Sequence, residues 1–241
     1  MNQSDLIPFP DTETLVQQVA GRWLDAVDAA NTAGKPFHVA LSGGRVAGRF
    51  MAAAHVLGTS RRTCWDTVHF HWGDERCVPP DHADSNYKLA QSVLLDPAGI
   101  DAARRHRLCG ELPPEEAARL AEAELARVTG TASGSVPVLD LVFLGMGEDG
   151  HVASLFPGAP QSVVTSTGWV IPVIGPKPPP QRLSLTFQVL AAAKEVWVLA
   201  SGAGKEEALK ESLRIGGNTP LAQLLSLRSH TRIMTDLPLP V

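Results

Sequence analysis

The residue of this chain best suited to moving a proton at neutral pH is a histidine that follows a glycine-rich turn. His151 ends the run Gly147-Glu148-Asp149-Gly150-His151, six residues after Gly145. Histidine titrates near neutrality, which suits a general base that takes a proton from water. Asp149 is close enough in sequence to accept the imidazole N–H and fix the tautomer of the ring. We therefore expect His151 and Asp149 to act as a catalytic pair.

Anion binding is the second chemistry that the sequence indicates. The segment Ser42-Gly43-Gly44-Arg45 precedes an expected helix, and glycines let a ligand approach the free N–H groups at a helix N-terminus. The segment has neither the GxGxxG nor the Walker A pattern, so nucleotide binding is not implied. A simple strand-to-helix turn remains the alternative.

Basic residues elsewhere strengthen the case for an anionic ligand. Arg76 follows Asp74 and Glu75 at an expected strand end, where an arginine can hold a phosphate through two parallel hydrogen bonds. A salt bridge to a neighbouring carboxylate is the alternative for Arg76. Lys177 and Arg182 flank three prolines that hold their loop extended. Together with Arg45, these side chains are expected to form a local cationic pocket in an acidic protein.

The other histidines and the cysteines give weaker signals. His69 and His71 would share one face of a strand, a spacing compatible with metal binding, but no third ligand lies at a suitable spacing. We therefore expect core or edge positions for them and no metal site. Cys64, Cys77 and Cys109 form no CxxC pair, which favours free thiols in a reducing compartment.

The periodicity of apolar residues predicts the elements that place these side chains. Helices are expected over residues 12–33, 45–57, 85–95, 114–128 and from 205 onward. Strands are expected over residues 37–41, 67–72, 138–144, 170–174, 183–187, 195–200 and 232–234.

Alternating helices and strands favour an α/β fold. The strands at 37–41, 138–144 and 195–200 are apolar on both faces, as in parallel sheets covered by helices on both sides. We predict a three-layer α/β/α sandwich with a mostly parallel, Rossmann-like sheet, built as a single domain over residues 1–241. Ligands bind at the carboxyl ends of the strands of such sheets. Four strand ends carry glycine or polar residues there, at 42–45, 73–76, 145–151 and 201–205.

Composition excludes several classes of function. A net charge of -4 gives no support for non-specific binding to nucleic acid or to a membrane surface. The chain has no apolar run of the roughly 18 residues that a membrane span requires, and its first residues lack the pattern of a signal peptide. We expect a cytoplasmic protein that acts on a small molecule, as a monomer or a weak homodimer.

At these motifs the chain resembles the 6-phosphogluconolactonases, over about residues 10–235. The segments that carry the resemblance are 41–44, 72–79 with 85–87, 144–158, 177–184 and Gly204-Lys205. The resemblance implies a sugar-phosphate isomerase-like fold and hydrolysis of a sugar-phosphate lactone without a cofactor, in the oxidative pentose phosphate pathway. It also implies that His151 is the general base and that Arg76, Lys177 and Arg182 bind phosphate and sugar. Asp74 and Lys205 lie in matching segments and join the expected substrate site.

One position departs from the family pattern. The first glycine motif usually continues with Thr-Pro, and this chain has Val46-Ala47 instead. A hydroxyl that would bind phosphate is therefore missing, and Arg45 is expected to compensate. Backbone N–H groups near Gly147 or Gly44 are the candidates for stabilising an oxyanion.

Two other functions stay open at this stage. A glucosamine-6-phosphate isomerase/deaminase would share the fold, and Asp74 is available as its base. Those isomerases have a glutamate where this chain has Phe156, and they tend to have a tyrosine where it has Arg76; both differences favour the lactonase. A non-catalytic sugar-phosphate sensor would use the same scaffold but needs no base such as His151.

Overall fold

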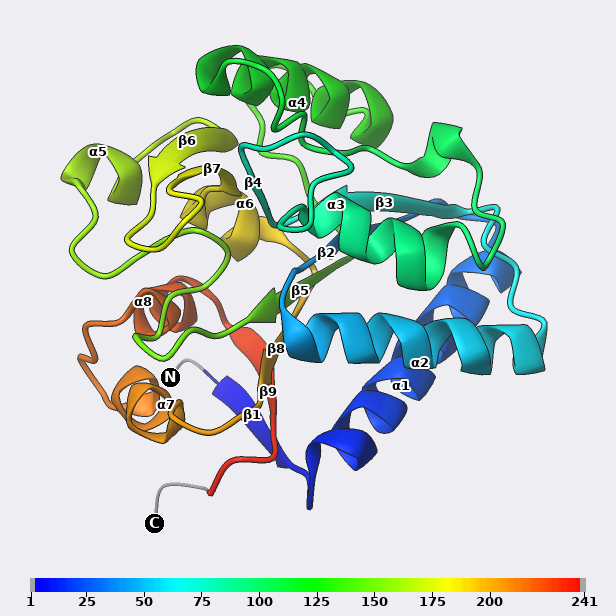
Figure 1. The fold of residues 1–241 in the computed structure, drawn as a ribbon, viewed down its shortest axis with the longest axis horizontal. Coiled ribbons are helices and arrows are strands. Elements are labelled where there is room, and N and C mark those ends of the chain that lie inside the picture. Colours follow the sequence, from blue (N-terminus) through cyan, green and yellow to red (C-terminus); the bar gives the residue numbers. More distant parts are fainter. Residues whose placement is uncertain (1–2, 239–241) are drawn as a thin grey trace.

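The computed structural model describes residues 3–238, which form two sheets surrounded by helices (Figure 1). The larger sheet has the strand order β1-β9-β8-β5-β2-β3, and every neighbouring pair in it is parallel. Its strands are β1 (Gln3–Pro8), β2 (Phe37–Leu41), β3 (Val68–Trp72), β5 (Leu141–Gly145), β8 (Glu195–Ala200) and β9 (His230–Thr235). The predicted α/β class with a mostly parallel sheet is confirmed.

The order of strands in this sheet reverses between β2 and β5. From β2 the chain moves outward to β3 on one side, and from β5 it continues through β8 and β9 on the other. In open parallel sheets, ligands bind in the crevice at such a reversal, outside the carboxyl ends of the strands. The segments that begin at Ser42 and Gly145 lie there.

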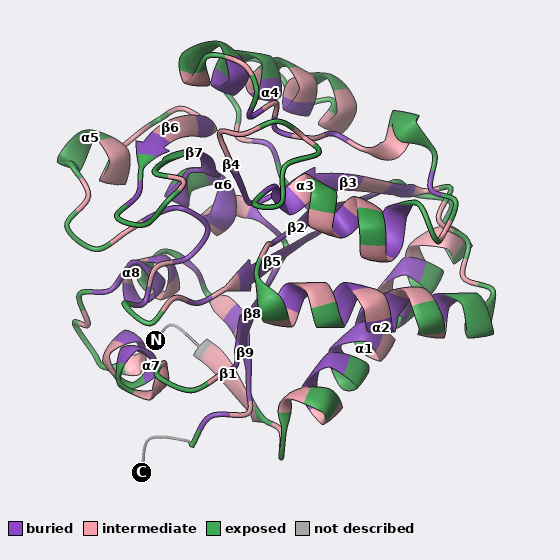
Figure 2. Ribbon diagram, in the orientation of Figure 1, coloured by how far each residue is buried: buried purple, intermediate pink, exposed green. Residues whose placement is uncertain are grey.

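Helices cover both faces of the larger sheet. Figure 1 shows α1 (Thr12–Thr32) and α2 (Arg45–Arg61) on one face. Their apolar sides meet the sheet in an aromatic cluster, in which the ring of Trp23 lies 5.4 Å from Phe50 and 5.4 Å from Phe143. In Figure 2 the buried residues gather along the strands and the inner sides of the helices, with exposed residues outside.

The remaining helices lie across the other face and around the strand ends. The helices are α3 (Asn86–Ala90) with a π-helical continuation (Gln91–Leu95), a short 3₁₀ turn (Ala102–Arg104), α4 (Pro114–Thr129), α5 (Gln161–Val164), α6 (Phe187–Ala192), α7 (Glu206–Leu213) and α8 (Pro220–Leu227). No helix within residues 3–238 combines the length and the apolar character that crossing a bilayer requires.

A small antiparallel sheet stands beside the larger one. Its order is β4 (Asp74–Arg76), β7 (Gln181–Leu185) and β6 (Val170–Ile174). Gly73 joins the two sheets, since its N–H donates to Leu41 of β2 and its carbonyl accepts from Leu185 of β7. The strand that leaves the large sheet as β3 thus enters the small sheet as β4.

The predicted strand over residues 183–187 was wrong in its bounds. The strand covers 181–185, and Phe187 begins α6. Leu183 and Leu185 alternate with polar residues, as a strand requires. Phe187 continues this sequence pattern, but in the structure it belongs to a helix and not to the strand. The N-terminal strand β1 and helix α8 were not predicted.

Candidate active site

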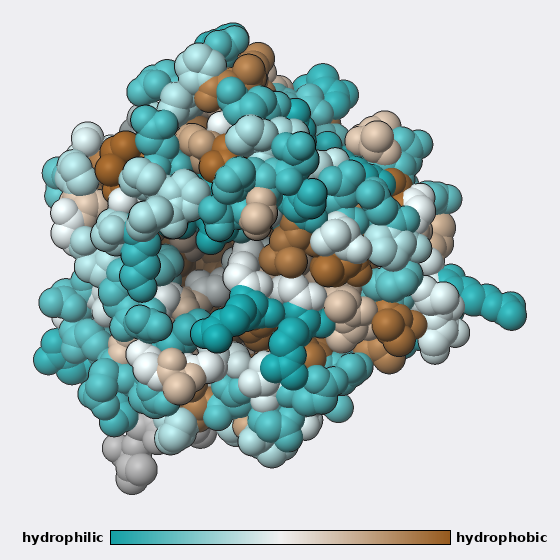
Figure 3. Space-filling model, in the orientation of Figure 1, coloured by the Kyte–Doolittle hydropathy of each residue, from teal (hydrophilic) through white to brown (hydrophobic). Residues whose placement is uncertain are grey.

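A cleft opens at the carboxyl edge of the large sheet, where β2, β5 and β8 end beside the small sheet. Its volume is about 690 Å³ when the space open to solvent is included. Figure 3 shows the surface hollowed over this region, with strongly hydrophilic side chains along the edge of the hollow. Nine of the predicted site residues line the cleft: Ser42, Gly43, Gly44, Arg45, Asp74, Arg76, His151, Arg182 and Lys205.

His151 presents one ring nitrogen to the cleft. Its Nδ1 lies 2.5 Å from Oδ1 of Asp149, and its backbone N–H donates to the same oxygen at 3.1 Å. The carboxylate therefore fixes the tautomer with the proton on Nδ1. Within residues 3–238, Nε2 has no hydrogen-bond partner, and the side chain is 28% exposed. A ring nitrogen without a hydrogen-bond partner, on a residue that lines the cleft, is the arrangement that a general base requires.

In the turn before His151, the backbone at Gly147 packs closely against the side chains of His151 and Asp149. A Cβ on Gly147 would lie 2.1 Å from Nδ1 of His151 and 2.6 Å from Oδ1 of Asp149, so a larger residue would displace the pair. The N–H of Gly147 donates to the carbonyl of His151 at 2.9 Å. This N–H closes the turn and is not free for a ligand.

Burial and the neighbouring histidine shift the pKa of Asp149 in opposite directions. Partial burial raises its pKa, but the charge of His151 and the hydrogen bonds from it outweigh burial, and the pKa ends below its ordinary value. Asp149 is therefore an anion at neutral pH and can stabilise a positive charge on the imidazole ring.

Two cationic side chains lie on adjacent strands of the small sheet. Arg76 of β4 is paired directly with Arg182 of β7 in the antiparallel register. Like charges at such a position repel. Burial lowers the pKa of Arg182, and the charge of Arg76 lowers it further. Among the residues that the structure describes, the Arg182 guanidinium donates only to backbone carbonyls, at Pro179 and Lys177.

A second cationic pair lies across the cleft, at the start of α2 and after β8. Burial lowers the pKa of Lys205, and the charge of Arg45 lowers it further. Gly44 caps α2 without a side-chain hydrogen bond, so the first N–H groups of the helix also face this region.

Among the described residues, none of these four cations forms an ion pair with a carboxylate. The arginines that do form such pairs include Arg49, Arg61 and Arg107. Uncompensated cations around a cleft create a positive potential that favours an anionic ligand. Lys177 is different, because it is 74% exposed, lies 3.7 Å from Glu148, and does not line the cleft.

Asp74 is the acidic residue of the cleft, and two side chains hold it. Ser154 Oγ donates to its Oδ2 at 2.7 Å, and Asn86 Nδ2 lies 3.3 Å from its Oδ1. Asp74 is only 6% exposed. Sequence reasoning assigned no role to Asn86 or Ser154, although both lie inside the segments that carry the family resemblance. A second tie, from the N–H of Gly145 to Ser42 Oγ at 3.2 Å, joins the ends of β5 and β2.

A buried carboxylate fixes the segment that carries Arg76 and Asn86. Glu75 is 2% exposed, and its two oxygens accept hydrogen bonds from the backbone N–H groups of Arg76, Asn86 and Tyr87 and from Ser85 Oγ. The loop after β4 is thus held against the start of α3.

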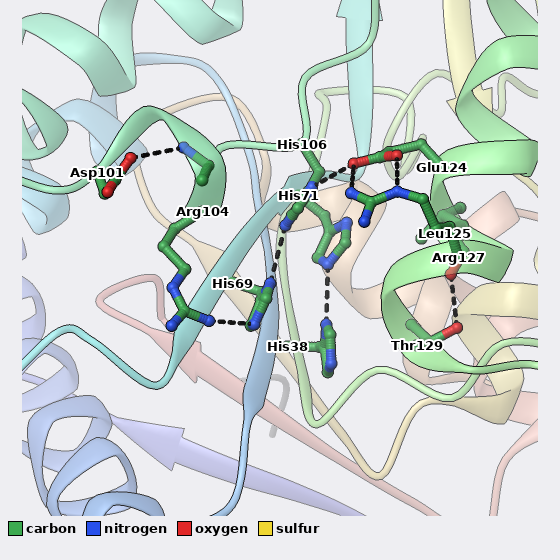
Figure 4. A network of polar contacts seen from close by, with 11 residues as sticks. His38, His69, His71, Asp101, Arg104, His106, Glu124, Leu125, Arg127 and Thr129 are labelled. Atoms are coloured by element: carbon green, nitrogen blue, oxygen red, sulfur yellow. Dashed lines mark hydrogen bonds and ion pairs between the residues drawn. The ribbon is translucent and has the colours of Figure 1, made fainter.

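His69 and His71 lie away from the cleft, between the sheet and α4 (Figure 4). Arg104 lies 2.6 Å from His69 Nε2, His69 Nδ1 lies 2.9 Å from His106 Nε2, and His106 Nδ1 lies 2.8 Å from Glu124 Oε1. Because a guanidinium only donates, His69 Nε2 accepts, its Nδ1–H donates to His106, and the Nδ1–H of His106 donates to Glu124. The chain of contacts assigns the ring protons of His69 and His106.

His38 completes this group, since its Nδ1 lies 3.1 Å from His71 Nε2. We call His38, His69, His71 and His106 the histidine cluster. Residues 3–238 contain no set of three or more potential ligands that could hold a metal ion. The expected core position holds for His71, which is 3% exposed.

Comparisons with known proteins agree with this geometry. Residues 10–233 match the family model of glucosamine-6-phosphate isomerases/6-phosphogluconolactonase. A 6-phosphogluconolactonase of Mycobacterium tuberculosis is 35% identical over 223 residues, covering 89% of this chain and 87% of the relative.

Two solved structures extend the likeness to three dimensions. One, described as devB protein, has a TM-score of 0.86 and 33% identity, and covers 97% of this chain and 96% of its own. The 6-phosphogluconolactonase of Trypanosoma brucei has a TM-score of 0.82 and 26% identity, and covers 98% and 97%.

Proposed function

The chain belongs to the glucosamine-6-phosphate isomerase/6-phosphogluconolactonase family, and we propose that it hydrolyses 6-phospho-D-glucono-1,5-lactone to 6-phospho-D-gluconate in the oxidative pentose phosphate pathway. The observation that carries this proposal is the pairing of a free imidazole nitrogen with uncompensated cations in one cleft. The imidazole can act as the base in the hydrolysis of an ester, and the cations can bind the phosphate of a phosphorylated substrate. The relatives at about a third identity or more bear the 6-phosphogluconolactonase name over most of this chain.

In the proposed reaction, Nε2 of His151 takes a proton from water while the water oxygen attacks C1 of the lactone. The carbonyl becomes an oxyanion on a tetrahedral carbon. Collapse of this intermediate breaks the bond from C1 to the ring oxygen, and protonated His151 returns its proton to that departing oxygen. Asp149 holds the ring and stabilises the imidazolium. General base catalysis of this kind contributes roughly 10²- to 10⁴-fold.

The N–H of Gly44 is our candidate donor to the oxyanion. It lines the cleft and has no hydrogen-bond partner among the described residues, whereas the N–H of Gly147 is engaged in its own turn. Donors fixed before the reaction stabilise developing charge without reorganising.

We assign the phosphate to the cations of the cleft. Arg45, Lys205 and the first N–H groups of α2 form one half of this binding surface, and Arg76 with Arg182 forms the other. Val46 and Ala47 offer no hydroxyl, so Arg45 replaces that contact with a charge. Lys177 does not line the cleft, and it would reach this binding surface only if its proline-rich loop moved. No cofactor takes part.

The decisive experiment compares His151→Ala with His55→Ala, a histidine on α2 that does not line the cleft. The rate of formation of 6-phosphogluconate from freshly made lactone should fall roughly 10²- to 10⁴-fold in the first variant and stay unchanged in the second. The Kd of 6-phosphogluconate, measured by calorimetry, should change only severalfold in either. Near-normal turnover in His151→Ala would refute the role of His151.

The alternative activity, isomerisation with deamination of glucosamine 6-phosphate, has one observation in its favour. Asp74 lies in the cleft, where it is placed to act as a base. Phe156 occupies the position of the glutamate of the isomerases, which favours the lactonase. Ammonia release from glucosamine 6-phosphate at a rate above lactone hydrolysis would decide for the alternative. Binding of 6-phosphogluconate with lactone hydrolysis left at the spontaneous rate would point to a sensor.

We further propose a single-domain enzyme of the cytoplasm, monomeric or weakly dimeric, that acts without nucleic acid or membrane partners. One contiguous apolar core that spans both sheets supports the single domain. Sedimentation of the purified chain tests its state of association.

A further inference from the structure

Phe156 is in contact with both kinds of functional group in the cleft, although the mechanism above gives it no task. Its ring centroid lies 4.7 Å from that of His151, with the planes tilted by 46°. The guanidinium carbon of Arg182 lies 5.5 Å from the same centroid. One aromatic ring therefore touches the general base and a buried cation of the anion site.

The backbone at Gly175 packs closely against both side chains. A Cβ on Gly175 would lie 2.9 Å from Cε2 of Phe156 and 3.0 Å from Nε of Arg182. The guanidinium of Arg182 is fixed from behind by the carbonyls of Pro179 and Lys177. The aromatic ring and the guanidinium are thus held against each other by the proline-rich loop.

We propose that Phe156 is a positioning residue of the hydrolytic site, whose ring orients the imidazole of His151 and stabilises the positive charge that His151 acquires during the reaction. The inference rests on the proposed function. The face of an aromatic ring carries partial negative charge and attracts a cation within about 6 Å of its centroid. Neutral His151 gains little from this attraction, and protonated His151 gains more. The ring therefore favours the transition state over the ground state.

The charged groups around the imidazole allow this effect to be isolated. Asp149 binds Nδ1, and the guanidinium carbon of Arg182 lies 5.5 Å from the centroid of the Phe156 ring. Glu148 and Lys177 lie 3.7 Å from each other in the adjoining loops and compensate each other's charge. A change confined to the electrons of the ring weakens its attraction to both Arg182 and protonated His151, but only His151 changes its charge during the reaction, so the effect on kcat reports on His151.

Progressive fluorination of Phe156 supplies that change. Replacing Phe156 by 4-fluoro-, 3,5-difluoro- and 3,4,5-trifluorophenylalanine removes negative charge from the ring face with little change of shape. We expect kcat for 6-phosphogluconolactone to fall stepwise, reaching roughly three- to tenfold for the trifluoro ring. The acid limb of the pH profile of kcat should move to lower pH, because the imidazolium is less stable. The Kd of 6-phosphogluconate should stay within twofold.

A control series at a second phenylalanine and one further variant of Phe156 test this interpretation. The same fluorinated series at Phe143, whose ring neighbours are Trp23, Phe50 and Trp197, should leave kcat and its pH profile unchanged. Phe156→Leu, which keeps an apolar side chain but no aromatic face, should lose at least as much kcat as the trifluoro ring.

The outcomes separate this inference from the proposed function. A kcat that is independent of fluorination, or that falls equally in the Phe143 series, overturns the role of Phe156. If His151→Ala nevertheless loses its activity, the proposed function stands and only the inference about Phe156 fails.

Discussion

His151 and the histidine cluster place the same side chain in two opposite environments. His151 has one nitrogen bound to Asp149 and the other open to a cleft lined by cations. In the cluster, the nitrogens of His69 and His106 are all used, and α4 covers the rings. Each site contains a carboxylate–imidazole pair, Asp149 with His151 and Glu124 with His106. The difference between the pairs is therefore the free nitrogen, which makes one pair chemically available and the other structural.

The largest expected effect is the response of the cluster to acid. Burial lowers the pKa of His69 to about 4 and that of His71 well below its ordinary value, and it also lowers the pKa of His38 and His106. Below about pH 6.5 the unfolded chain therefore binds more protons at these rings than the folded chain does.

The free energy of unfolding should therefore fall as the pH falls from 7 to 5. The loss is roughly 2 kcal/mol for each ring that stays neutral at pH 5. Urea titrations between pH 5 and 8 measure it, and His71→Phe should flatten the slope. Equal stability at pH 5 and pH 7 would contradict the assignment of neutral rings.

Removing the charge of Asp149 should have the next largest effect. Asp149→Asn keeps the shape of the side chain but cannot stabilise the imidazolium. Hydrogen bonds to charged groups contribute about 1.5–3 kcal/mol, so kcat should fall about 10- to 100-fold. Steady-state kinetics measure this fall, and the melting temperature should change little. An unaltered kcat would remove Asp149 from the mechanism.

The equivalent substitution of a carboxylate by an amide in the Glu124–His106 pair should change stability but not activity. Glu124 accepts from His106 and binds Arg127, and Glu124→Gln weakens both contacts. The free energy of unfolding should fall by about 1 kcal/mol, with kcat unchanged. Urea titration and kinetics on the same preparation check both halves. A reduced kcat would mean that the two histidine sites communicate.

The smallest expected effect concerns the cations that distinguish the cleft from the cluster. Lys205 is partly buried with no carboxylate partner among the described residues, so Lys205→Met removes an unfavourable charge. The variant should be more stable by about 0.5–1 kcal/mol and bind 6-phosphogluconate more weakly. Thermal unfolding with and without 6-phosphogluconate measures both. A loss of stability without ligand would indicate a structural ion pair instead.

Local sequence patterns predicted much of the fold and the key part of the site. The bounds of the strands over 37–41, 170–174 and 195–200 were predicted correctly, because each is a short apolar run closed by turn residues. The place of His151 after β5 follows from the glycine turn. The pairing of Asp149 with His151 spans only two residues and is equally local.

Features that depend on distant residues could not be predicted in this way. The segment of β1 is polar at several positions and becomes a strand only because β9 lies beside it. The histidine cluster draws His38, His106 and Glu124 from separate parts of the chain. The register that sets Arg76 opposite Arg182 depends on how β4 and β7 pair across more than a hundred residues.

That register couples occupancy of the cleft to the integrity of the small sheet. Arg76 and Arg182 occupy directly opposed positions of β4 and β7, and neither forms an ion pair with a carboxylate among the described residues. On the proposed function, each departure of the product restores a repulsion inside the sheet that carries the proline-rich loop. A phosphate bound at the proposed site would relieve it, so part of the affinity for substrate would be stored in the scaffold before any ligand arrives.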